Sequence, residues 1–255
     1  MAIPLVFFLT CSALVMKILK LIGTIWVILG VCFIIWQWNS YRAQGFDASI
    51  LQNSSTVKVT DNDSSIVFTP TTVVRKVLVF FPGALVEPEA YAPLLRKVAE
   101  AGYKAVIVKM PFRQAQYGYS SKETIGLFSD PKMKYCLAGH SKGAAMAAKF
   151  VFKNLAKVDG LVLIGTTHPR DFDLSSANIP VLKIYGTEDG VADAPQIMDN
   201  KSLLPKSTQF FPVKGGNHAQ FSYYGYQLGD HPASISREKQ QAITLRILLE
   251  YLKEM

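Results

Sequence analysis

The sequence has few residues of the kinds that build metal centres and disulfide frameworks. It contains three cysteines, Cys11, Cys32 and Cys136, and each lies in an apolar run without the spacing of a disulfide framework. Four histidines are present, and no His/Cys spacing typical of metal ligands occurs among them. Internal repeats and low-complexity tracts are also absent. We therefore expect no cofactor and no metal.

Charge is sparse and unevenly placed. The formal net charge is +8, but the first 45 residues contain no acid and three bases, Lys17, Lys20 and Arg42. The remaining residues carry only a mild basic excess, without Arg-rich runs or stripes of basic and aromatic residues. This pattern argues against a nucleic-acid partner.

A long uncharged run, residues 21–41, predicts one transmembrane helix. Its 21 residues would rise about 31 Å as a helix, close to the thickness of a hydrocarbon core. Flanking residues fit the two interfaces, with two lysines before the run and three aromatic residues at its end: Lys17, Lys20, Trp36, Trp38 and Tyr41. We expect a single-pass anchor in the cell membrane and a domain division into residues 1–45 and 46–255.

Two alternatives remain at the N-terminus. A cleaved signal peptide competes with the anchor, although the run exceeds a typical h-region and lacks a nearby small-x-small site. Translation could begin at Met1 or at Met16. Positive charge is denser before the span than after it, which favours an extracytoplasmic position for the C-terminal domain.

After a polar connector, apolar runs alternate with helical patterns. A hairpin is predicted around "TDND" (60–63), and the following strands are expected at 76–83, 104–111, 134–139, 160–165, 181–186 and 208–213. Helices are expected at 88–102, 122–128, 142–154, 194–204 and 236–255. This alternation predicts an α/β fold, a mostly parallel doubly wound sheet, with ligands at the carboxyl ends of its strands.

The stretch "YCLAGHSKGAA" (135–145) places a serine between glycines where a predicted strand meets a predicted helix. Gly139 to Gly143 fit the Gly-x-Ser-x-Gly pattern, in which glycines permit a sharp turn that exposes the serine hydroxyl. Ser141 is therefore a candidate nucleophile. A serine needs a base to accept its proton and a carboxylate to orient that base.

Both partners occur at later strand ends. "YGTEDGVAD" (185–193) offers Glu188, Asp189 and Asp193, and "VKGGNHAQF" (213–221) offers His218. We expect structural or solvated roles for the three other histidines, His140, His168 and His231.

This layout resembles the α/β-hydrolase superfamily over essentially residues 55–255. Within it, "GGNHAQFSYYGYQLGD" and "YGTEDG" resemble a compact dienelactone-hydrolase-like group of bacterial proteins. The resemblance implies that Ser141 is the nucleophile, Asp189 the acid and His218 the base. Glu188 and Asp193 are then loop charges.

The resemblance also implies two backbone donors for the oxyanion. One is Lys142, after the nucleophile, and the other comes from the "PGALVEP" loop (82–88), with Ala84 and Leu85 as candidates; Pro82-Gly83 replaces the commoner His-Gly opening. Only about fifteen residues connect 165 to 181, so no cap domain fits. The cleft should be open, with Phe221, Tyr223 and Tyr224 as candidate lining residues.

The leading hypothesis is a membrane-tethered serine hydrolase, carboxylesterase-like, that cleaves an ester, thioester or lactone through an acyl-enzyme on Ser141. Its substrate would be a small or surface-presented acyl compound. There are two alternatives: an acyltransferase that uses the same triad, and a non-catalytic binding module. Dehalogenase and epoxide-hydrolase chemistry ordinarily requires aspartate at the nucleophile position, which Ser141 disfavours. The sequence leaves the oligomeric state open.

Overall fold

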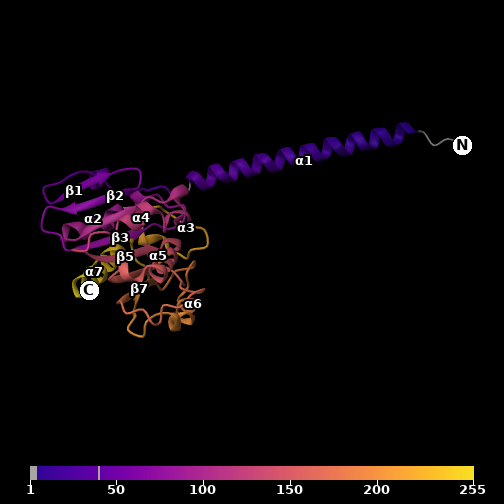
Figure 1. The fold of residues 1–255 in the computed structure, drawn as a ribbon. Helices are drawn as coiled ribbons and strands as arrows, with labels where there is room; N and C mark the ends of the chain where they lie inside the picture. Colours follow the sequence, from indigo (N-terminus) through magenta and orange to yellow (C-terminus); the bar gives the residue numbers. More distant parts are fainter. Residues whose placement is uncertain (1–4, 40) are drawn as a thin grey trace. The chain divides into compact units, whose positions relative to one another are not determined.

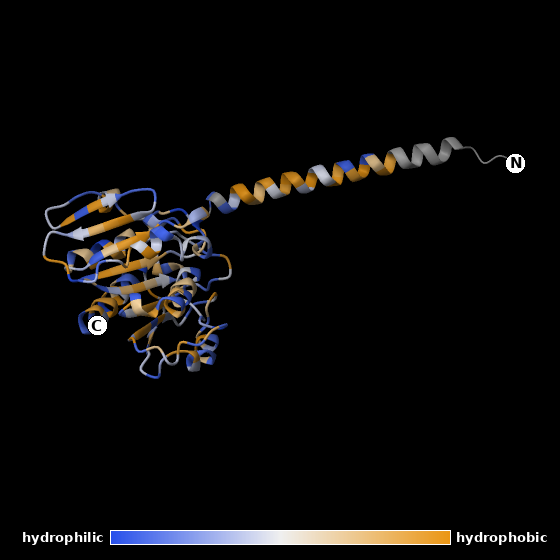
Figure 2. Ribbon diagram, viewed as in Figure 1, coloured by the Kyte–Doolittle hydropathy of each residue, from blue (hydrophilic) through white to orange (hydrophobic). Residues whose placement is uncertain are grey.

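One long helix precedes the residues that fold around a sheet. The computed structural model describes residues 5–39 and 41–255, which belong to two units, Met1–Ser40 and Tyr41–Met255. Helix α1 runs from Leu5 to Asn39 (Figure 1). Within it, Leu14–Gln37 has a mean hydropathy of 2.5 and no buried residue, and Figure 2 shows this stretch as largely hydrophobic. The helix is long and apolar enough to cross a membrane.

The structure describes only some of the residues on which the two possible start sites and the aromatic belt depend. Met1 and the side chain of Trp38 lie outside the described residues. Tyr41 does not belong to the helix, because α1 ends at Asn39 and the ring of Tyr41 packs edge-on against Tyr224 at a centroid distance of 5.2 Å. Tyr41 therefore belongs to the sheet-containing unit and not to helix α1.

Eight strands form one sheet, in the order β1-β2-β4-β3-β5-β6-β7-β8. The strands are β1 (Val57–Asp61), β2 (Ser65–Pro70), β3 (Lys76–Phe81), β4 (Lys104–Val108), β5 (Lys134–His140), β6 (Gly160–Ile164), β7 (Val181–Gly186) and β8 (Gln209–Val213). β1 and β2 form the predicted antiparallel hairpin, and β4 through β8 and β3 run parallel to one another. The mostly parallel α/β sheet predicted from the sequence is confirmed.

The second unit also contains six α-helices and six short 3-10 segments, of which η1 precedes the first strand and η6 and α7 follow the last. The α-helices are α2 (Ala92–Glu100), α3 (Ala115–Gly118), α4 (Lys122–Gly126), α5 (Lys142–Lys153), α6 (Ala194–Asp199) and α7 (Arg237–Glu254). The 3-10 segments are η1 (Ala48–Leu51), η2 (Pro88–Tyr91), η3 (Pro111–Arg113), η4 (Leu155–Lys157), η5 (Lys201–Leu203) and η6 (Ala219–Phe221). Residues 165–180, all of them described, contain no helix, so no helical cap is built here.

The helices cover both faces of the sheet because its central strands are apolar on both. In β3, Leu78 and Phe80 face a core shared with α2 and α7, whereas Val79 and Phe81 face a second core shared with α5. Successive strand residues point to opposite faces, so a continuous apolar run is buried on both sides. Figure 2 shows long hydrophobic stretches along several strands of the sheet.

The sheet-containing unit begins before the predicted boundary at residue 46. Arg42 forms an ion pair with Glu87, and the backbone N–H of Gln44 donates to the carbonyl of Tyr223 at 2.8 Å. Tyr41 accepts a hydrogen bond from the backbone N–H of Glu87 at 3.1 Å. Residues 41–44 therefore pack on the sheet-containing unit, which begins five residues before the position at which the sequence placed the start of that domain.

Candidate active site

Ser141 occupies a sharp turn between β5 and α5. Its backbone lies at φ 53° and ψ −121°, a conformation that side-chain-bearing residues rarely adopt. The flanking glycines make the turn possible. A Cβ on Gly139 would lie 2.6 Å from the Ala144 nitrogen, and a Cβ on Gly143 would lie 2.0 Å from the Phe81 carbonyl oxygen. Helix α5 can approach β3 and β5 this closely only with glycine at both positions.

His218 and Asp189 form a buried pair. Nδ1 of His218 lies 2.8 Å from Oδ2 of Asp189, and both side chains are inaccessible to solvent. The other carboxylate oxygen accepts the backbone N–H groups of Val191 and Ala192, at 2.9 and 2.7 Å. Asp189 is thus held by its own loop and in turn orients the imidazole. Nε2 of His218 is buried and has no hydrogen-bond partner among the described residues.

The neighbouring acids have other roles. Asp193 caps helix α6 by accepting the backbone N–H of Gln196 at 3.0 Å. Glu188 is half-buried, and its backbone N–H donates to the carbonyl of Gly216 at 2.8 Å. Of the three acids that the sequence offered, the structure brings only Asp189 to His218.

A second buried carboxylate, that of Asp230, holds the backbone around His218. It accepts the N–H groups of His218, Ala219 and Gly190 at 3.2, 2.8 and 3.2 Å. The sequence analysis did not identify Asp230 as a site residue, although Asp230 is the last residue of the quoted stretch "GGNHAQFSYYGYQLGD". A carboxylate that binds main-chain donors leaves no periodicity by which a sequence would reveal it.

The loop after β3 offers one free donor beside the nucleophile turn. The N–H of Gly83 donates to the Tyr91 hydroxyl at 2.9 Å, and the N–H of Leu85 donates to the carbonyl of Arg113 at 2.7 Å. Leu85 is therefore not available as an oxyanion donor, which corrects that candidate. The N–H of Ala84 has no acceptor among the described residues. Lys142 begins α5, where the first N–H groups of a helix lack intrahelical acceptors.

Tyr91 joins this loop to His140, the residue before the nucleophile. Its hydroxyl lies 2.9 Å from Nδ1 of His140, and both side chains are buried. Because the hydroxyl accepts from Gly83, its own proton can be donated to His140. Burial, and secondarily the nearby His218, lower the pKa of His140 well below its usual value. His140 is thus neutral, with its ring centroid 4.5 Å from that of His218.

A small open pocket of about 180 Å³ lies over Ser141. It is lined by Ser141, Lys142, Ala145, Gly165, Thr166, Thr167, His168, Val191, Ala192 and His218. Typical small-molecule pockets have volumes of about 300–1,000 Å³, so this one fits a small group. Ser141 and His218 therefore line the same pocket.

The three aromatic residues expected in the cleft lie elsewhere. Phe221 and Tyr224 are buried in the core beneath α2 and α7, and Tyr223 packs against Phe46 at a centroid distance of 5.8 Å. None of the three lines the pocket over Ser141. Their assignment to the cleft is wrong, because the chain turns at η6 directly after His218, which directs Phe221 and Tyr224 into the core and leaves Tyr223 against Phe46.

The part of the pocket wall formed by His168 is supported by a buried lysine. Lys183, on β7, is fully buried and donates through Nζ to the carbonyl oxygen of His168 at 2.8 Å. Burial, and secondarily Arg170, lower the pKa of Lys183 to about 7. His168 is half-buried in this wall, and its pKa is lowered mainly by burial. His231 is exposed, as the sequence predicted for a loop residue.

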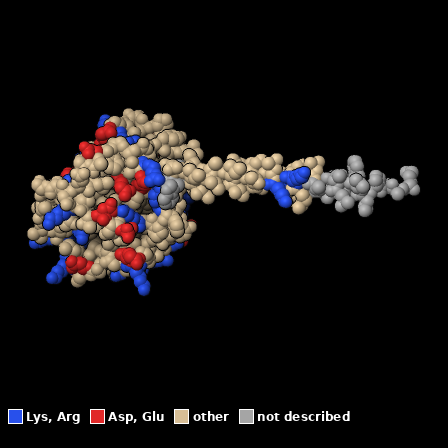
Figure 3. All heavy atoms as spheres, turned by 90° about the horizontal axis from the view of Figure 1, so that it is seen from above, with Lys and Arg blue, Asp and Glu red and all other residues tan. Residues whose placement is uncertain are grey.

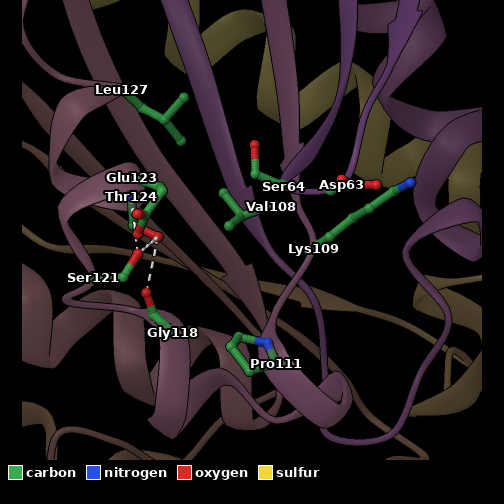
Figure 4. A pocket seen from close by; sticks show the side chains of 10 residues that line it. All are labelled: Asp63, Ser64, Val108, Lys109, Pro111, Gly118, Ser121, Glu123, Thr124 and Leu127. Carbon is green, nitrogen blue, oxygen red and sulfur yellow. Dashed lines mark hydrogen bonds between the residues drawn. The ribbon is translucent and has the colours of Figure 1, made fainter.

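Other surfaces of this unit offer weaker candidates. Figure 3 shows basic and acidic side chains interspersed over the visible face of the unit, without a large region of one sign. A second pocket of about 220 Å³ lies beside β4, α3 and α4 (Figure 4). Its hydroxyl groups serve local structure, since Ser121 caps α4 and Thr124 donates to the carbonyl of Gly118 at 2.8 Å. Within residues 5–39 and 41–255, no cluster of three His, Cys, Asp or Glu side chains is placed to hold a metal ion.

Solved structures share this fold at low sequence identity. A putative dienelactone hydrolase from Klebsiella pneumoniae subsp. pneumoniae MGH 78578 matches with a TM-score of 0.57 and 14% identity, covering 80% of this chain and 100% of the other. A soluble variant of monoglyceride lipase from Saccharomyces cerevisiae has a TM-score of 0.58 and 11% identity, with coverage of 80% and 96%. A ferulic acid esterase from Streptomyces cinnamoneus has a TM-score of 0.55 and 18% identity, with coverage of 72% and 68%.

Comparison at the level of sequence gives a family but no individual relative. No curated protein sequence matches the chain significantly. The family model described as "Alpha/beta hydrolase family" matches residues 77–242, which include the Ser141 turn, Asp189 and His218. This match covers more than half of the chain and spans β3 to α7. The chain therefore belongs to the α/β-hydrolase family.

Proposed function

We propose that this chain is a membrane-tethered serine hydrolase that cleaves a carboxylic ester, thioester or lactone through an acyl-enzyme on Ser141. One observation carries the proposal. His218 is bonded through Nδ1 to a buried carboxylate, while its unpartnered Nε2 belongs to a residue that lines the same pocket as Ser141. A base in this state can take a proton from the serine hydroxyl.

The chemical steps follow from these positions. Ser141 Oγ attacks the acyl carbon as its proton moves to Nε2 of His218, and the carbonyl oxygen becomes an oxyanion. That proton then passes to the leaving alcohol or thiol as its bond to the acyl carbon breaks. Water, deprotonated by the same nitrogen, attacks the acyl-enzyme; the bond to Ser141 Oγ then breaks, Oγ takes the proton back from Nε2, and the acid is released. Asp189 stabilises the imidazolium formed in each half-reaction.

The oxyanion would be stabilised by the backbone N–H groups of Lys142 and Ala84. Lys142 is the first residue of a 12-residue helix, whose dipole places partial positive charge at that end. Preorganised donors of this kind contribute about 3–4 kcal/mol each to transition-state stabilisation. The neutral His140 beside His218 adds no charge that would oppose the imidazolium.

The size of the pocket favours a small acyl group or one presented from a surface. The open cleft lacks a helical cap, and the structural neighbours include an esterase, a monoglyceride lipase and a dienelactone hydrolase. These neighbours support ester chemistry as a class without selecting a substrate. Helix α1 supplies the proposed tether, with the hydrolase unit on the extracytoplasmic side.

Labelling with a fluorophosphonate probe tests the nucleophile. Ser141 Oγ should displace fluoride from phosphorus in the full-length, detergent-solubilised protein, and Ser141→Ala should abolish both labelling and hydrolysis of p-nitrophenyl acetate. Ser55→Ala, at an exposed serine far from the turn in sequence, is the matched control and should behave as the wild type. Undiminished hydrolysis by a folded Ser141→Ala protein would refute the assignment.

A further inference from the structure

Four large apolar side chains are exposed on two connecting segments of the sheet-containing unit, residues 110–121 and 222–230, which we call loops although the first contains η3 and α3. Phe112 and Tyr117 are 76% and 67% exposed, and Tyr226 and Leu228 are both 73% exposed. We call these four residues the apolar rim. Single exposed apolar residues are ordinary, whereas several that surround one part of a surface are typical of an interaction site.

Both loops flank the segment at which the unit begins. On one side, Gln44 bonds through its side chain to the carbonyl of Tyr224 at 3.0 Å, and Tyr226 lies close enough to Tyr41 to help raise the pKa of that hydroxyl, after burial. On the other side, Arg42 pairs with Glu87, and both charges act on Arg113, the neighbour of Phe112. The apolar rim therefore borders residues 41–44 on two sides.

The backbone holds Phe112 in this exposed position under strain. Phe112 and Arg113 both lie in the left-handed region, at φ 53° and 54°, where aromatic and long side chains are rare. The loop is also packed tightly, because a Cβ on Gly118 would lie 2.6 Å from Cδ of Pro111. A folded chain keeps such strain mainly where a function uses it. Here it presents an aromatic ring to the surroundings.

The same loop is coupled to the catalytic pocket. The Arg113 carbonyl accepts the N–H of Leu85, which adjoins the proposed oxyanion donor Ala84. Phe112 follows β4 by four residues, so it lies at the carboxyl edge of the parallel strands, where Ser141 also lies. The apolar rim and the pocket thus share one edge of the sheet.

Chain length limits how far the rim can be from a membrane that α1 crosses. The apolar span ends at Gln37, and Tyr41 follows four residues later. Four residues reach at most about 14 Å when fully extended. At any angle between the two units, Tyr41, the first residue of the segment that the rim borders, therefore stays within about 14 Å of the end of the span.

The composition of the loops suits the interfacial layer of a bilayer. Residues 110–121 carry a single charged side chain, Arg113, and residues 222–230 carry only the buried Asp230. Tyrosine, with an apolar ring and a polar hydroxyl, is enriched at the level of lipid headgroups, and arginine can keep its charge in water there.

We propose that the apolar rim inserts into the interface of the bilayer that α1 spans, and that the Ser141 pocket takes its acyl ester from that membrane surface. The substrate class is an amphipathic ester whose carbonyl lies at headgroup level. This inference rests on the proposed tether and on the proposed hydrolase. It adds the docking surface and the source of the substrate.

Spin labels on the full-length protein test the docking. The protein is reconstituted in nanodiscs of phosphatidylcholine and phosphatidylglycerol, with Cys11 and Cys32 changed to serine and the fully buried Cys136 left in place. Nitroxides at Phe112→Cys and Tyr226→Cys are compared with Val73→Cys, an 84% exposed site between β2 and β3 at the opposite edge. We expect the two rim labels to be relaxed by oxygen and protected from a water-soluble nickel chelate, and the Val73 label to show the reverse.

Hydrolysis rates provide the second test of the proposal. For Tyr117→Ser/Leu228→Ser, the rate on a fluorogenic ester dissolved in the nanodisc, divided by the rate on p-nitrophenyl acetate in water, should fall about tenfold. Val73→Ser should leave this ratio unchanged. Rim labels as accessible to nickel as the Val73 label, or an unchanged ratio in the rim variant, would overturn the inference while leaving Ser141 labelling and membrane partitioning intact. Extraction of the protein from membranes by salt would overturn the tether and the rim together.

Discussion

The hydroxyl of Tyr91 lies 2.9 Å from Nδ1 of His140, and this buried contact connects two parts of the proposed active site. The same hydroxyl accepts the N–H of Gly83, next to the proposed oxyanion donor Ala84. The imidazole of His140 in turn packs against that of His218. Tyr91 is therefore a positioning residue, since it holds the oxyanion loop and the residue before the nucleophile in one arrangement.

Tyr91→Phe should lower both stability and rate. The change leaves the Gly83 N–H and His140 Nδ1 buried without partners, which costs about 1–3 kcal/mol of unfolding free energy. Loosening of the oxyanion loop should lower kcat more than it raises KM, and it should slow fluorophosphonate labelling. Chemical denaturation and steady-state kinetics measure the two effects. Tyr103→Phe, half-buried at the start of β4, is the control; equal kcat values for the two variants would contradict the positioning role.

Asp189→Asn and Asp230→Asn should separate catalysis from scaffolding. In Asp189→Asn, the amide oxygen can still accept from Val191 and Ala192, but the amide nitrogen faces His218 and stabilises the wrong imidazole tautomer. We expect a rate loss on the order of 10⁴-fold with little loss of stability.

In Asp230→Asn, one acceptor oxygen becomes a donor that faces backbone N–H groups, so stability should fall by about 1–3 kcal/mol and the rate should fall with it. Thermal unfolding and kcat/KM are measured on both variants. A stable Asp230→Asn protein, or an Asp189→Asn protein with near-normal turnover, would reverse these assignments.

Local patterns predicted much of the fold, whereas contacts between distant residues escaped prediction. The central strands β3 to β7 are apolar runs, and the turn at Ser141 is encoded by adjacent glycines, so both can be predicted from neighbouring positions. The role of Leu85 depends on the Arg113 carbonyl, 28 positions away, and no local pattern reveals that hydrogen bond. Tyr91 likewise reads as an apolar position of a helix. Only its position in the fold shows that its hydroxyl meets Gly83 and His140.

The prediction that the aromatic residues after His218 line the cleft was wrong for a related reason. Phe221 and Tyr224 follow the proposed base closely, and proximity in sequence suggested proximity to the substrate. The 3-10 turn η6 redirects the chain, and both rings enter the core under α2 and α7. Burial of such large apolar rings outweighs any preference for the cleft, because full burial of one aromatic side chain contributes about 1.5–3 kcal/mol.

A fragment that begins at Tyr41 should be more stable than one that begins at Phe46. The longer fragment keeps the Arg42–Glu87 ion pair and the packing of Tyr41 on Tyr224, and both should be soluble without α1. Loss of these contacts should cost about 1–2 kcal/mol, or roughly 2–8 °C in Tm for a domain of this size. Differential scanning calorimetry of the two fragments measures the difference. Identical Tm values would show that residues 41–45 add nothing to the fold.

Lys183→Met should change how stability depends on pH. Burial lowers the pKa of Lys183 to about 7 in the folded protein, whereas a lysine in the unfolded chain titrates near 10.4. Between these values the unfolded state binds more protons, so the contribution of Lys183 makes the free energy of unfolding rise with pH. Below about pH 7 both states hold the proton, and the contribution is constant. Methionine has no proton to bind, so the variant should lack this rise.

The measurement is urea unfolding of the Tyr41–Met255 fragment at pH 6.5, 8 and 9.5. The wild type should gain stability relative to Lys183→Met as the pH increases, with most of the gain between pH 7 and 9.5. Buried tyrosines with raised pKa values, including Tyr91 and Tyr224, act in the opposite direction near and above pH 10, but they are present in both proteins and cancel in the difference. Lys149→Met, at a half-exposed position of α5, controls for the loss of a lysine. A wild-type-minus-variant difference that stays flat over this range would show that Lys183 keeps its proton in the folded protein, with its ammonium group compensated by the His168 carbonyl.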